Sequence, residues 1–318
     1  MRALITGASG FAGSWLCREC AAAGDEVVAA SRRGVVVDGC GRGATVDLRS
    51  AEEALRLVRT VAPDVVYHLA SLTSVGRSWQ EPAQTLADND AISVNMLEAL
   101  RHGAPGARVV WVSSCEIYGE PAVLPAPEDS RPRPANPYAV SKVSGELLAE
   151  LYVAAYGLQI VRARPFSHSG PGQLPLFLLS NLARQAATAR LAGAPELEIT
   201  TGNPDTRRDF TDVRDVVRAY RLLALSPAWG DAVGDVYNVS SAASISAADQ
   251  VALLRDLLAP TAVSHVVDPS LRRAHEVMDL RGDHARITAL TGWRPQIPLR
   301  QTMTDTIAWW ERELSAAG

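Results

Sequence analysis

The sequence predicts an α/β fold, with a doubly wound parallel sheet and a smaller, interleaved α/β lobe. Short apolar segments alternate with helical patterns through the first half of the chain, as is typical of a parallel sheet covered on both faces. A glycine-rich turn follows the first apolar segment. The 318 residues exceed one ordinary core, yet no low-complexity linker divides them.

The first half supplies most of the expected sheet. We expect strands at residues 3–6, 26–30, 44–46, 64–69, 108–112 and 159–163, because each is a short apolar run bounded by turn residues. Helices are expected between these strands, from the glycine turn through residue 23 and at about 50–61, 82–102 and 137–156.

The pattern changes after residue 164. A loop at 165–172 precedes an alanine-rich helix and a strand at 196–201, and a helix at 213–225 with a strand at 236–239 predicts that the parallel sheet resumes. The last part mixes helices with a proline-rich segment. We therefore assign residues 1–165 to one domain, whose sheet resumes at about 212–240, and residues 166–211 and 241–318 to the second lobe.

Composition excludes several classes of protein. Hydrophobic residues make up 47% and charged residues 21%, which indicates a globular chain, and a net charge of −4 argues against nucleic-acid binding. We expect no membrane helix, because no apolar run approaches about 20 residues, and no signal peptide. The four cysteines (Cys17, Cys20, Cys40 and Cys115) predict no disulfide framework and no metal site. We expect a cytoplasmic protein.

The glycine turn predicts a dinucleotide site of the Rossmann type. Gly7, Gly10 and Gly13 follow a strand and open a helix. These positions allow a tight turn, a close backbone approach to a pyrophosphate at the helix N-terminus, and close packing of helix on sheet. The first domain is therefore the expected dinucleotide-binding domain.

The end of the second strand favours NADP over NAD. An acid there would bond the ribose 2′-hydroxyl of NAD, whereas this chain has Ser31, Arg32 and Arg33. Arginine suits a 2′-phosphate. The alternative is that both arginines are simply solvated. Asp47 and Leu48, after the third strand, are expected beside the adenine.

Tyr138 and Lys142 are the candidate proton-transfer pair. A spacing of four residues places both on one face of the expected helix. An ammonium beside a phenol stabilises the phenolate, so we expect the pKa of Tyr138 to be lowered from its ordinary value of about 10. A tyrosine at a helix start with a solvated lysine remains the alternative.

Together these motifs resemble the extended short-chain dehydrogenase/reductases that act on nucleotide sugars. The resemblance includes Thr6–Gly13, His68-Leu-Ala-Ser71, Asn89, Ser113-Ser-Cys-Glu-Ile-Tyr-Gly119 and the Tyr138/Lys142 pair. It implies that Ser114 joins Tyr138 and Lys142 in catalysis. Asn89 resembles an asparagine that organises a proton path, or it is a helix amide that bonds backbone. The implied cofactor contacts are Gly7, Ser9, Gly10, Phe11, Ala12, Gly13, Arg32, Arg33, Asp47, Leu48, Leu69, Ala70, Ser71, Tyr138, Lys142 and Arg164.

The second half is most similar to the GDP-4-dehydro-6-deoxy-D-mannose reductases, with GDP-mannose 4,6-dehydratases as close relatives. The similarity lies in residues 164–173, 202–215 and 291–299. It implies a GDP-linked deoxysugar substrate bound by Ser114, Glu116, Ser167, His168, Asn181, Arg184, Arg208, Arg273 and Glu276. Two residues depart from the relatives' pattern: Ser167 replaces their usual asparagine and Ala274 their usual proline.

Glu116 leaves the reaction open between reduction and dehydration. A carboxylate two residues beyond Ser114 could remove the proton next to a 4-keto group, as a dehydratase requires. Phe11 and Ala12 stand where such dehydratases usually have Gln-Asp, and the position of Ser114 usually holds threonine there, so we favour a reductase. Its product would be GDP-D-rhamnose or the C4 epimer. An epimerase, another 4-ketoreductase and a cofactor-binding regulator without chemistry are the alternatives. We expect a homodimer.

Overall fold

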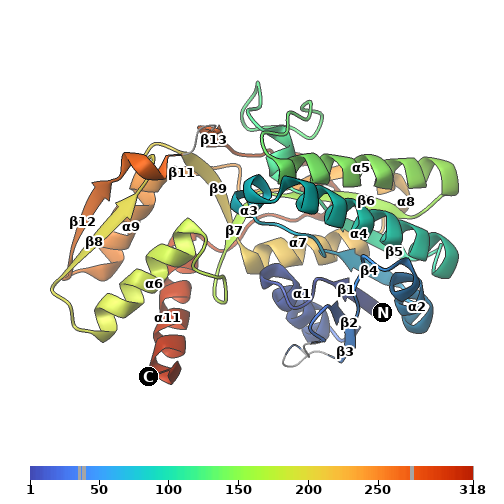
Figure 1. Ribbon diagram of the computed structural model, residues 1–318, viewed down its shortest axis with the longest axis horizontal. Coiled ribbons are helices and arrows are strands. Elements are labelled where there is room, and N and C mark those ends of the chain that lie inside the picture. Colours follow the sequence, from blue (N-terminus) through green and yellow to red (C-terminus); the bar gives the residue numbers. More distant parts are fainter. Residues whose placement is uncertain (35–36, 38–40, 273–275, 318) are drawn as a thin grey trace.

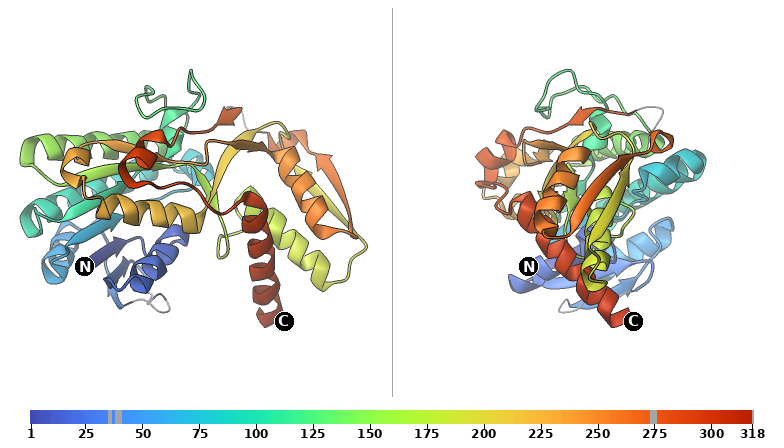
Figure 2. Two further views of the ribbon diagram at one scale, coloured as in Figure 1. Left: turned by 180° about the vertical axis from the view of Figure 1, so that it is seen from behind. Right: turned by 90° about the vertical axis from the view of Figure 1, so that its left-hand side faces the viewer.

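The computed structural model describes residues 1–34, 37, 41–272 and 276–317. Cys40, Arg273 and Ala274, which the sequence analysis named, lie outside these residues. The described part forms two lobes, and Figures 1 and 2 show a large sheet lobe beside a smaller one. Within it, no helix is long and apolar enough to cross a bilayer.

A seven-stranded parallel sheet forms the large lobe, which confirms the predicted fold class. Its strands, in spatial order, are β10 (Val236–Val239), β6 (Ile160–Pro165), β5 (Arg108–Val112), β4 (Val65–His68), β1 (Arg2–Thr6), β2 (Glu26–Ser31) and β3 (Arg42–Thr45). The chain order reverses direction beside β1, because β2 and β4 lie on its two sides. That reversal opens a crevice at the carboxyl edge of the sheet, where ligands of such folds bind.

Helices cover both faces of this sheet. One face carries α1 (Phe11–Ala22), α7 (Val213–Leu225), α8 (Trp229–Ala232) and α10 (Ala285–Thr291), and the other carries α2 (Ala51–Val61), α4 (Pro82–Gly103) and α5 (Pro137–Tyr156). Short α3 (Val75–Gln80) lies beside α4 and α5. Near-continuous apolar strands are buried between these two layers, as the sequence pattern predicted.

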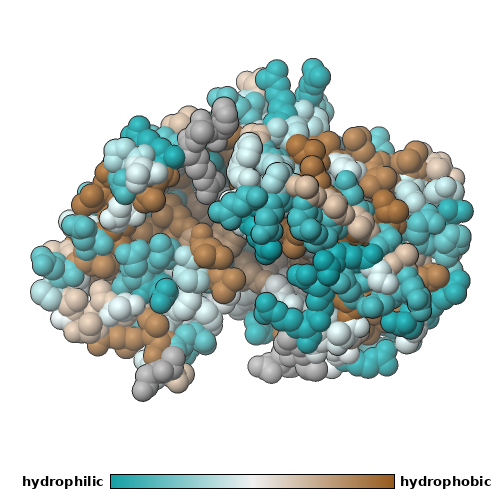
Figure 3. All heavy atoms as spheres, in the orientation of Figure 1, coloured by the Kyte–Doolittle hydropathy of each residue, from teal (hydrophilic) through white to brown (hydrophobic). Residues whose placement is uncertain are grey.

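The smaller lobe contains short strands and three packed helices. One sheet joins β7 (Ser167–Ser169), β9 (Arg207–Asp212), β11 (Ser244–Ser246) and β13 (Asp279–Leu280); a second pairs β8 (Glu196–Thr201) with β12 (Ala262–Val267). Its helices are α6 (Leu178–Leu191), α9 (Ala247–Leu258) and α11 (Leu299–Ala317), with the 3-10 turn η2 (Pro269–Leu271). Figure 3 shows a hollow between the two lobes.

Most expected elements are present with small shifts at their ends. The helix expected at 137–156 is α5, and the strand expected at 236–239 is β10, which pairs with β6. The sequence analysis did not place β7, β9, β11, β12 or β13, and β7 lies within the segment 165–172 that was expected to be a loop. These strands are short or partly exposed, so they lack the apolar run that marks a buried strand.

Candidate active site

The glycine turn lies at the crevice, between β1 and α1. Gly7 has φ of +71°, and a Cβ on it would lie 2.9 Å from the backbone nitrogen of Ala70 after β4. A Cβ on Gly13 would lie 2.3 Å from the carbonyl oxygen of Gly7. Gly10 begins α1 without a side-chain cap, so the positive end of the helix can receive an anion. These features fit a bound pyrophosphate, with Ser9, Phe11 and Ala12 in the same segment.

The residues after β2 and β3 are those expected to bind the adenosine part of the cofactor. Arg32 and Arg33 are exposed, and they form no ion pair with residues that the structure describes. The Asp47 carboxylate instead accepts a hydrogen bond from Arg49, with Oδ2 2.6 Å from Nη2. The hydrogen bonds from Arg49 lower the pKa of Asp47 to about 2. Leu48 is buried. Two unpaired guanidinium groups beside this crevice fit a 2′-phosphate.

The segment after β4 is held in place by Asn89. The Asn89 Oδ1 accepts from the backbone nitrogen of Leu72 at 2.7 Å and from the Ser71 hydroxyl at 3.3 Å. Its Nδ2 donates to the Leu72 carbonyl at 3.1 Å and to the Ser141 hydroxyl at 2.8 Å. These contacts favour the structural alternative for Asn89, because they fix Ser71 and Leu72 against α4 and α5.

Ser114, Tyr138 and Lys142 are close together at the carboxyl edge of the sheet. Ser114 follows β5 and hydrogen-bonds the phenol of Tyr138, which is the second residue of α5. Lys142 lies one turn later, with Nζ 5.8 Å from the centre of the Tyr138 ring. Its ammonium donates to the Val112 carbonyl at 3.0 Å. The local spacing and the end of β5 thus place a hydroxyl, a phenol and an ammonium at one site.

The predicted lowering of the Tyr138 pKa was wrong. Burial raises the pKa of Tyr138, the hydrogen bond from Ser114 opposes that rise, and the charge of Glu116 adds to it. Burial also lowers the pKa of Lys142 to about 8, against the charge of Glu146. Removal from water therefore outweighs the hydrogen bond from Ser114. A protonated phenol is the form that gives a proton to a substrate oxygen.

Glu116 is tied to the start of α5 through Asn136. Glu116 lies in the 3-10 turn η1 (Cys115–Tyr118), and its Oε2 accepts from Asn136 Nδ2 at 2.9 Å. Asn136 is the N-cap of α5, and its Oδ1 accepts from the backbone nitrogen of Ala139 at 2.8 Å. The sequence analysis did not identify Asn136. An asparagine directly before Pro137 at a helix start was the available signal.

Arg164 lies in a buried network, where it bonds protein groups. Its guanidinium donates to Glu146 at 2.9 and 2.7 Å, to the Tyr118 hydroxyl at 2.9 Å and to the Glu128 carbonyl at 2.8 Å. The residue is 5% exposed. We therefore revise its expected role from cofactor contact to support of α5, because every nitrogen of the guanidinium already donates to a protein group.

His168 brings the smaller lobe to the glycine turn. Its ring stacks on Phe11 with centroids 6.0 Å apart, and its Nδ1 bonds the Phe166 carbonyl at 3.0 Å. Nearby, Trp15 Nε1 donates to the carbonyl of Pro171 at 2.9 Å. Ser167, the residue that departs from the relatives' pattern, is half-buried beside His168. The two lobes therefore meet at the turn expected to hold the cofactor.

The other expected substrate residues are spread over the small lobe. Asn181 and Arg184 are exposed on α6, where the Arg184 guanidinium lies 5.7 Å from the centre of the Trp310 ring. Arg208 donates to the carbonyls of Arg207 and Val277 at 2.7 and 2.8 Å. Glu276 accepts from Asn203 at 2.7 Å. Arg273 lies outside the described residues, so its position cannot be compared with theirs.

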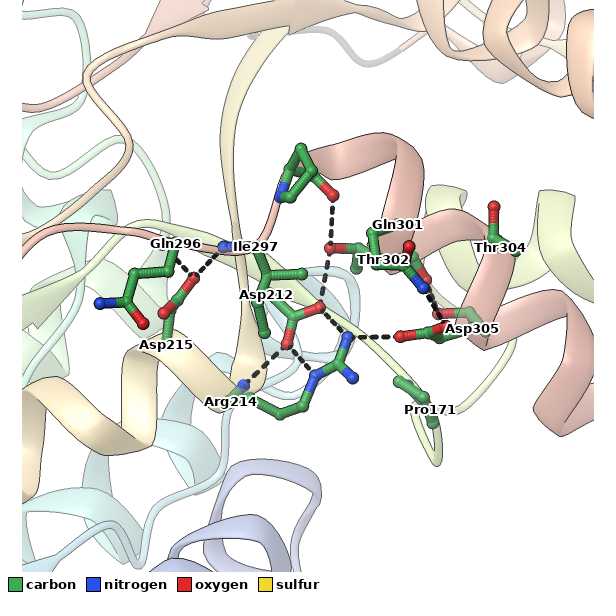
Figure 4. A network of polar contacts seen from close by, with 12 residues as sticks. Pro171, Asp212, Arg214, Asp215, Gln296, Ile297, Gln301, Thr302, Thr304 and Asp305 are labelled. Atoms are coloured by element: carbon green, nitrogen blue, oxygen red, sulfur yellow. Dashed lines mark hydrogen bonds and ion pairs between the residues drawn. The ribbon is translucent and has the colours of Figure 1, made fainter.

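An ion-pair network joins the two lobes beneath the crevice. Arg214 Nη2 donates to Asp212 at 2.8 Å and to Asp305 at 2.7 Å, and Thr302 donates to Asp212 at 2.7 Å (Figure 4). Asp212 begins α7 under the large sheet, whereas Thr302 and Asp305 belong to α11. This network fixes the small lobe relative to the cofactor crevice.

The chain is similar to known proteins over most of its length. Residues 4–306 match the family described as GDP-mannose 4,6 dehydratase. A GDP-6-deoxy-D-mannose reductase of Pseudomonas aeruginosa is 38% identical over 252 residues, covering 78% of this chain and 81% of that protein. A UDP-glucose 4-epimerase of Mycolicibacterium smegmatis is 31% identical, with 96% and 97% covered.

A solved structure supports the same relationship. The structure of RMD from Pseudomonas aeruginosa, complexed with NADPH, has a TM-score of 0.84 and 32% identity, covering 98% of this chain and 100% of that one. With the glycine turn, these matches confirm the resemblance to extended short-chain dehydrogenase/reductases of nucleotide sugars and a nicotinamide cofactor. The chain is an NAD(P)-dependent oxidoreductase that belongs to the GDP-mannose 4,6 dehydratase family.

Proposed function

We propose that this chain reduces the C4 keto group of a GDP-4-keto-6-deoxyhexose with NADPH, giving GDP-D-rhamnose or its C4 epimer. The observation that carries the proposal is the hydrogen bond between Ser114 and a buried Tyr138, one helical turn from Lys142. The 38% identity to a GDP-6-deoxy-D-mannose reductase favours the GDP-linked sugar.

The cofactor would lie along the glycine turn, with its 2′-phosphate toward Arg32 and Arg33. Asp47, Leu48, Leu69, Ala70 and Ser71 would line the adenosine and ribose. When bound, the reduced nicotinamide supplies the hydride. NADP is our first choice and NAD the second, because Arg32 and Arg33 leave no acid at this position.

The side chains of the site would complete the reduction by supplying a proton. The Ser114 hydroxyl orients the C4 oxygen, and the Tyr138 phenol donates its proton to that oxygen as the carbonyl becomes an alcohol. Lys142 stabilises the phenolate that remains. Burial of Tyr138 keeps the phenol protonated before the reaction, which suits the reductive direction.

The substrate would lie in the hollow between the lobes. Ser167 and His168 would meet the sugar, while Asn181, Arg184, Arg208 and Arg273 would receive the diphosphate through charge-assisted hydrogen bonds. Glu276 would bond the nucleotide ribose. Glu116 would contact the sugar, and a dehydratase is the second candidate because this carboxylate lies near Tyr138.

We also propose a homodimer built on α4 and α5. Val140, Leu147 and Leu151 of α5 are 43%, 61% and 57% exposed. They share one face of the helix, since their spacing is close to whole turns. Covering such a face with a second copy would remove apolar surface from water. Sedimentation of the wild type and of a Leu147→Glu variant would report the association.

Product analysis tests the proposed function. Purified protein would be given NADPH or NADH with GDP-4-keto-6-deoxymannose and its dTDP, UDP and CDP counterparts, and products identified by NMR. We expect NADPH oxidation and a reduced GDP-sugar. In a second reaction with GDP-mannose and NADP⁺, formation of the 4-keto sugar would instead identify a dehydratase. Cofactor binding without turnover of any of these sugars would contradict an enzymatic role in this chemistry.

A further inference from the structure

We propose that Asn136 is a positioning residue that holds the Glu116 carboxylate at the start of α5, beside Tyr138. This inference deepens the proposed function and rests on it. Neither Asn136 nor its contact with Glu116 follows from the sequence motifs, because residues 116 and 136 are separated by a long loop.

The two halves of the Asn136 amide perform different tasks. Oδ1 accepts from the Ala139 backbone and so caps α5, while Nδ2 donates to Glu116 Oε2 at 2.9 Å. Asn136 is 7% exposed, so both contacts are shielded from water. Serine and aspartate also cap helices well, but neither offers an amide N–H₂ group to a neighbouring carboxylate. Asparagine is therefore suited to both tasks at once.

The contact closes a ring of interactions around the proposed proton donor. Ser114 bonds the Tyr138 phenol, and its Oγ also accepts from the Glu116 backbone at 3.2 Å. The Glu116 side chain bonds Asn136, and Asn136 caps the helix that carries Tyr138. A change at Asn136 would thus release the carboxylate without removing any group that we expect to touch substrate.

The charges around Tyr138 predict how release of Glu116 would affect the phenol. Glu116 and Cys115 lie nearby in η1, Lys142 lies on α5, and the Tyr220 phenol faces it from α7. The Glu116 charge acts to raise the pKa of Tyr138. If the carboxylate moves away, the Tyr138 phenol loses its proton more easily. The alkaline limb of the rate profile then moves to lower pH.

A double-mutant cycle separates this role from a structural one. The variants are Asn136→Ser, which keeps a cap but removes the amide, Glu116→Gln, and the two combined. We expect Asn136→Ser to lower kcat by about 10- to 100-fold, in the range that misplacement of a group by about 1 Å can produce, with little change in the KM for NADPH. In the Glu116→Gln background the same change should alter kcat less than about 2-fold, because the negative charge that Asn136 positions is already absent.

Two further variants distinguish a loss of carboxylate positioning from a general loss of stability. Asn136→Asp retains the cap and repels Glu116, so it should lower kcat as Asn136→Ser does. Ser246→Ala removes the cap of α9 in the other lobe, so we expect a lower Tm with unchanged kcat and pH profile. Independent, multiplying effects of Asn136→Ser and Glu116→Gln would overturn the proposal, as would wild-type kcat in Asn136→Ser.

The experiments distinguish a failure of the proposed function from a failure of the proposed role of Asn136. The wild-type product identifies the reaction as reduction or dehydration, and the cycle is then measured on whichever reaction the wild type performs. A dehydratase whose cycle shows coupling would overturn the reductase assignment and support the role of Asn136. A reductase whose cycle shows no coupling would support the reductase assignment and overturn the role of Asn136.

Discussion

Arg164 and Glu146 form a two-pronged ion pair inside the sheet lobe. Both carboxylate oxygens receive a guanidinium nitrogen, at 2.9 and 2.7 Å, and the side chains are 6% and 5% exposed. Glu146 lies on α5 one turn after Lys142, and Arg164 lies on β6. The pair thus fastens α5 to the sheet, and the structure gives Arg164 this task instead of the expected cofactor contact.

We predict that removing either partner of this pair is strongly destabilising. Arg164→Met or Glu146→Leu leaves an uncompensated buried charge and should lower the free energy of unfolding by about 3–5 kcal/mol. The double variant should recover much of that loss, since no charge remains buried. Urea unfolding measures both values. Arg56→Gln is the control, because Arg56 and its partner Glu52 are 63% and 89% exposed, and the change should cost less than about 1 kcal/mol. Equal losses in both pairs would contradict the prediction.

Tyr138→Phe should remove the proton donor and leave the fold intact. We expect kcat to fall by about 10²- to 10⁴-fold, the usual contribution of a positioned acid. Tyr220→Phe is the matched control: Tyr220 is 0% exposed, and its hydroxyl has no hydrogen-bond partner in the part of the chain that the structure describes. That variant should retain kcat. Steady-state kinetics compares the two, and near-wild-type kcat in Tyr138→Phe would rule out the assigned role.

Cofactor preference should depend on Arg32 and Arg33. Replacing both with glutamate should lower kcat/KM for NADPH by about 100-fold, because two charge-assisted contacts to a phosphate are lost. The value for NADH should change little. Replacing Arg300 and Arg312 of α11 with glutamate makes the same change in net charge at exposed positions away from the glycine turn, and so serves as the control. An equal loss with both cofactors would show that the arginines support the fold and not the 2′-phosphate.

His68 should make the free energy of unfolding depend on pH below about 6.5. Burial lowers the pKa of His68 from 6.5 to about 3, and Lys142 acts in the same direction. Between these values the unfolded chain binds more protons than the folded one, so the free energy of unfolding should fall as pH drops from about 6.5 toward 3. His68→Gln should weaken this dependence.

Asp209 has the opposite effect on the pH dependence of stability. The His68 effect must therefore be measured as a difference between wild type and His68→Gln. Burial raises the pKa of Asp209 from 3.8 to about 6, against hydrogen bonds from Ser241. The folded chain then binds more protons between these values, and stability falls as pH rises through that range. The two trends oppose each other. Unfolding of wild type and His68→Gln should therefore be compared at each pH, and identical slopes would contradict the assignment.

The predicted parts of the site depend on local spacing. Tyr138 and Lys142 lie four residues apart on one helix, and the helix itself fixes their relation. The turn at Gly7 and Gly13 is likewise confined to one strand and the helix that follows it. Ser114 is the second residue after β5, so the carboxyl edge of the sheet was its expected position. A single sequence contains all of this information.

Tertiary structure decided what those residues contact. The pKa of Tyr138 rises because burial outweighs the hydrogen bond from Ser114, and burial depends on how the surrounding elements pack. Arg164 bonds Glu146 instead of a cofactor because β6 runs beside α5. Residues 116 and 136, and the strands β8 and β12, meet across long intervals of chain. The sequence by itself determined the fold class, the glycine turn and the helix that carries Tyr138 and Lys142, since these follow from periodicity and local spacing. Long-range pairings depend on which surfaces the packed sheet brings together, and no spacing along the chain specifies them.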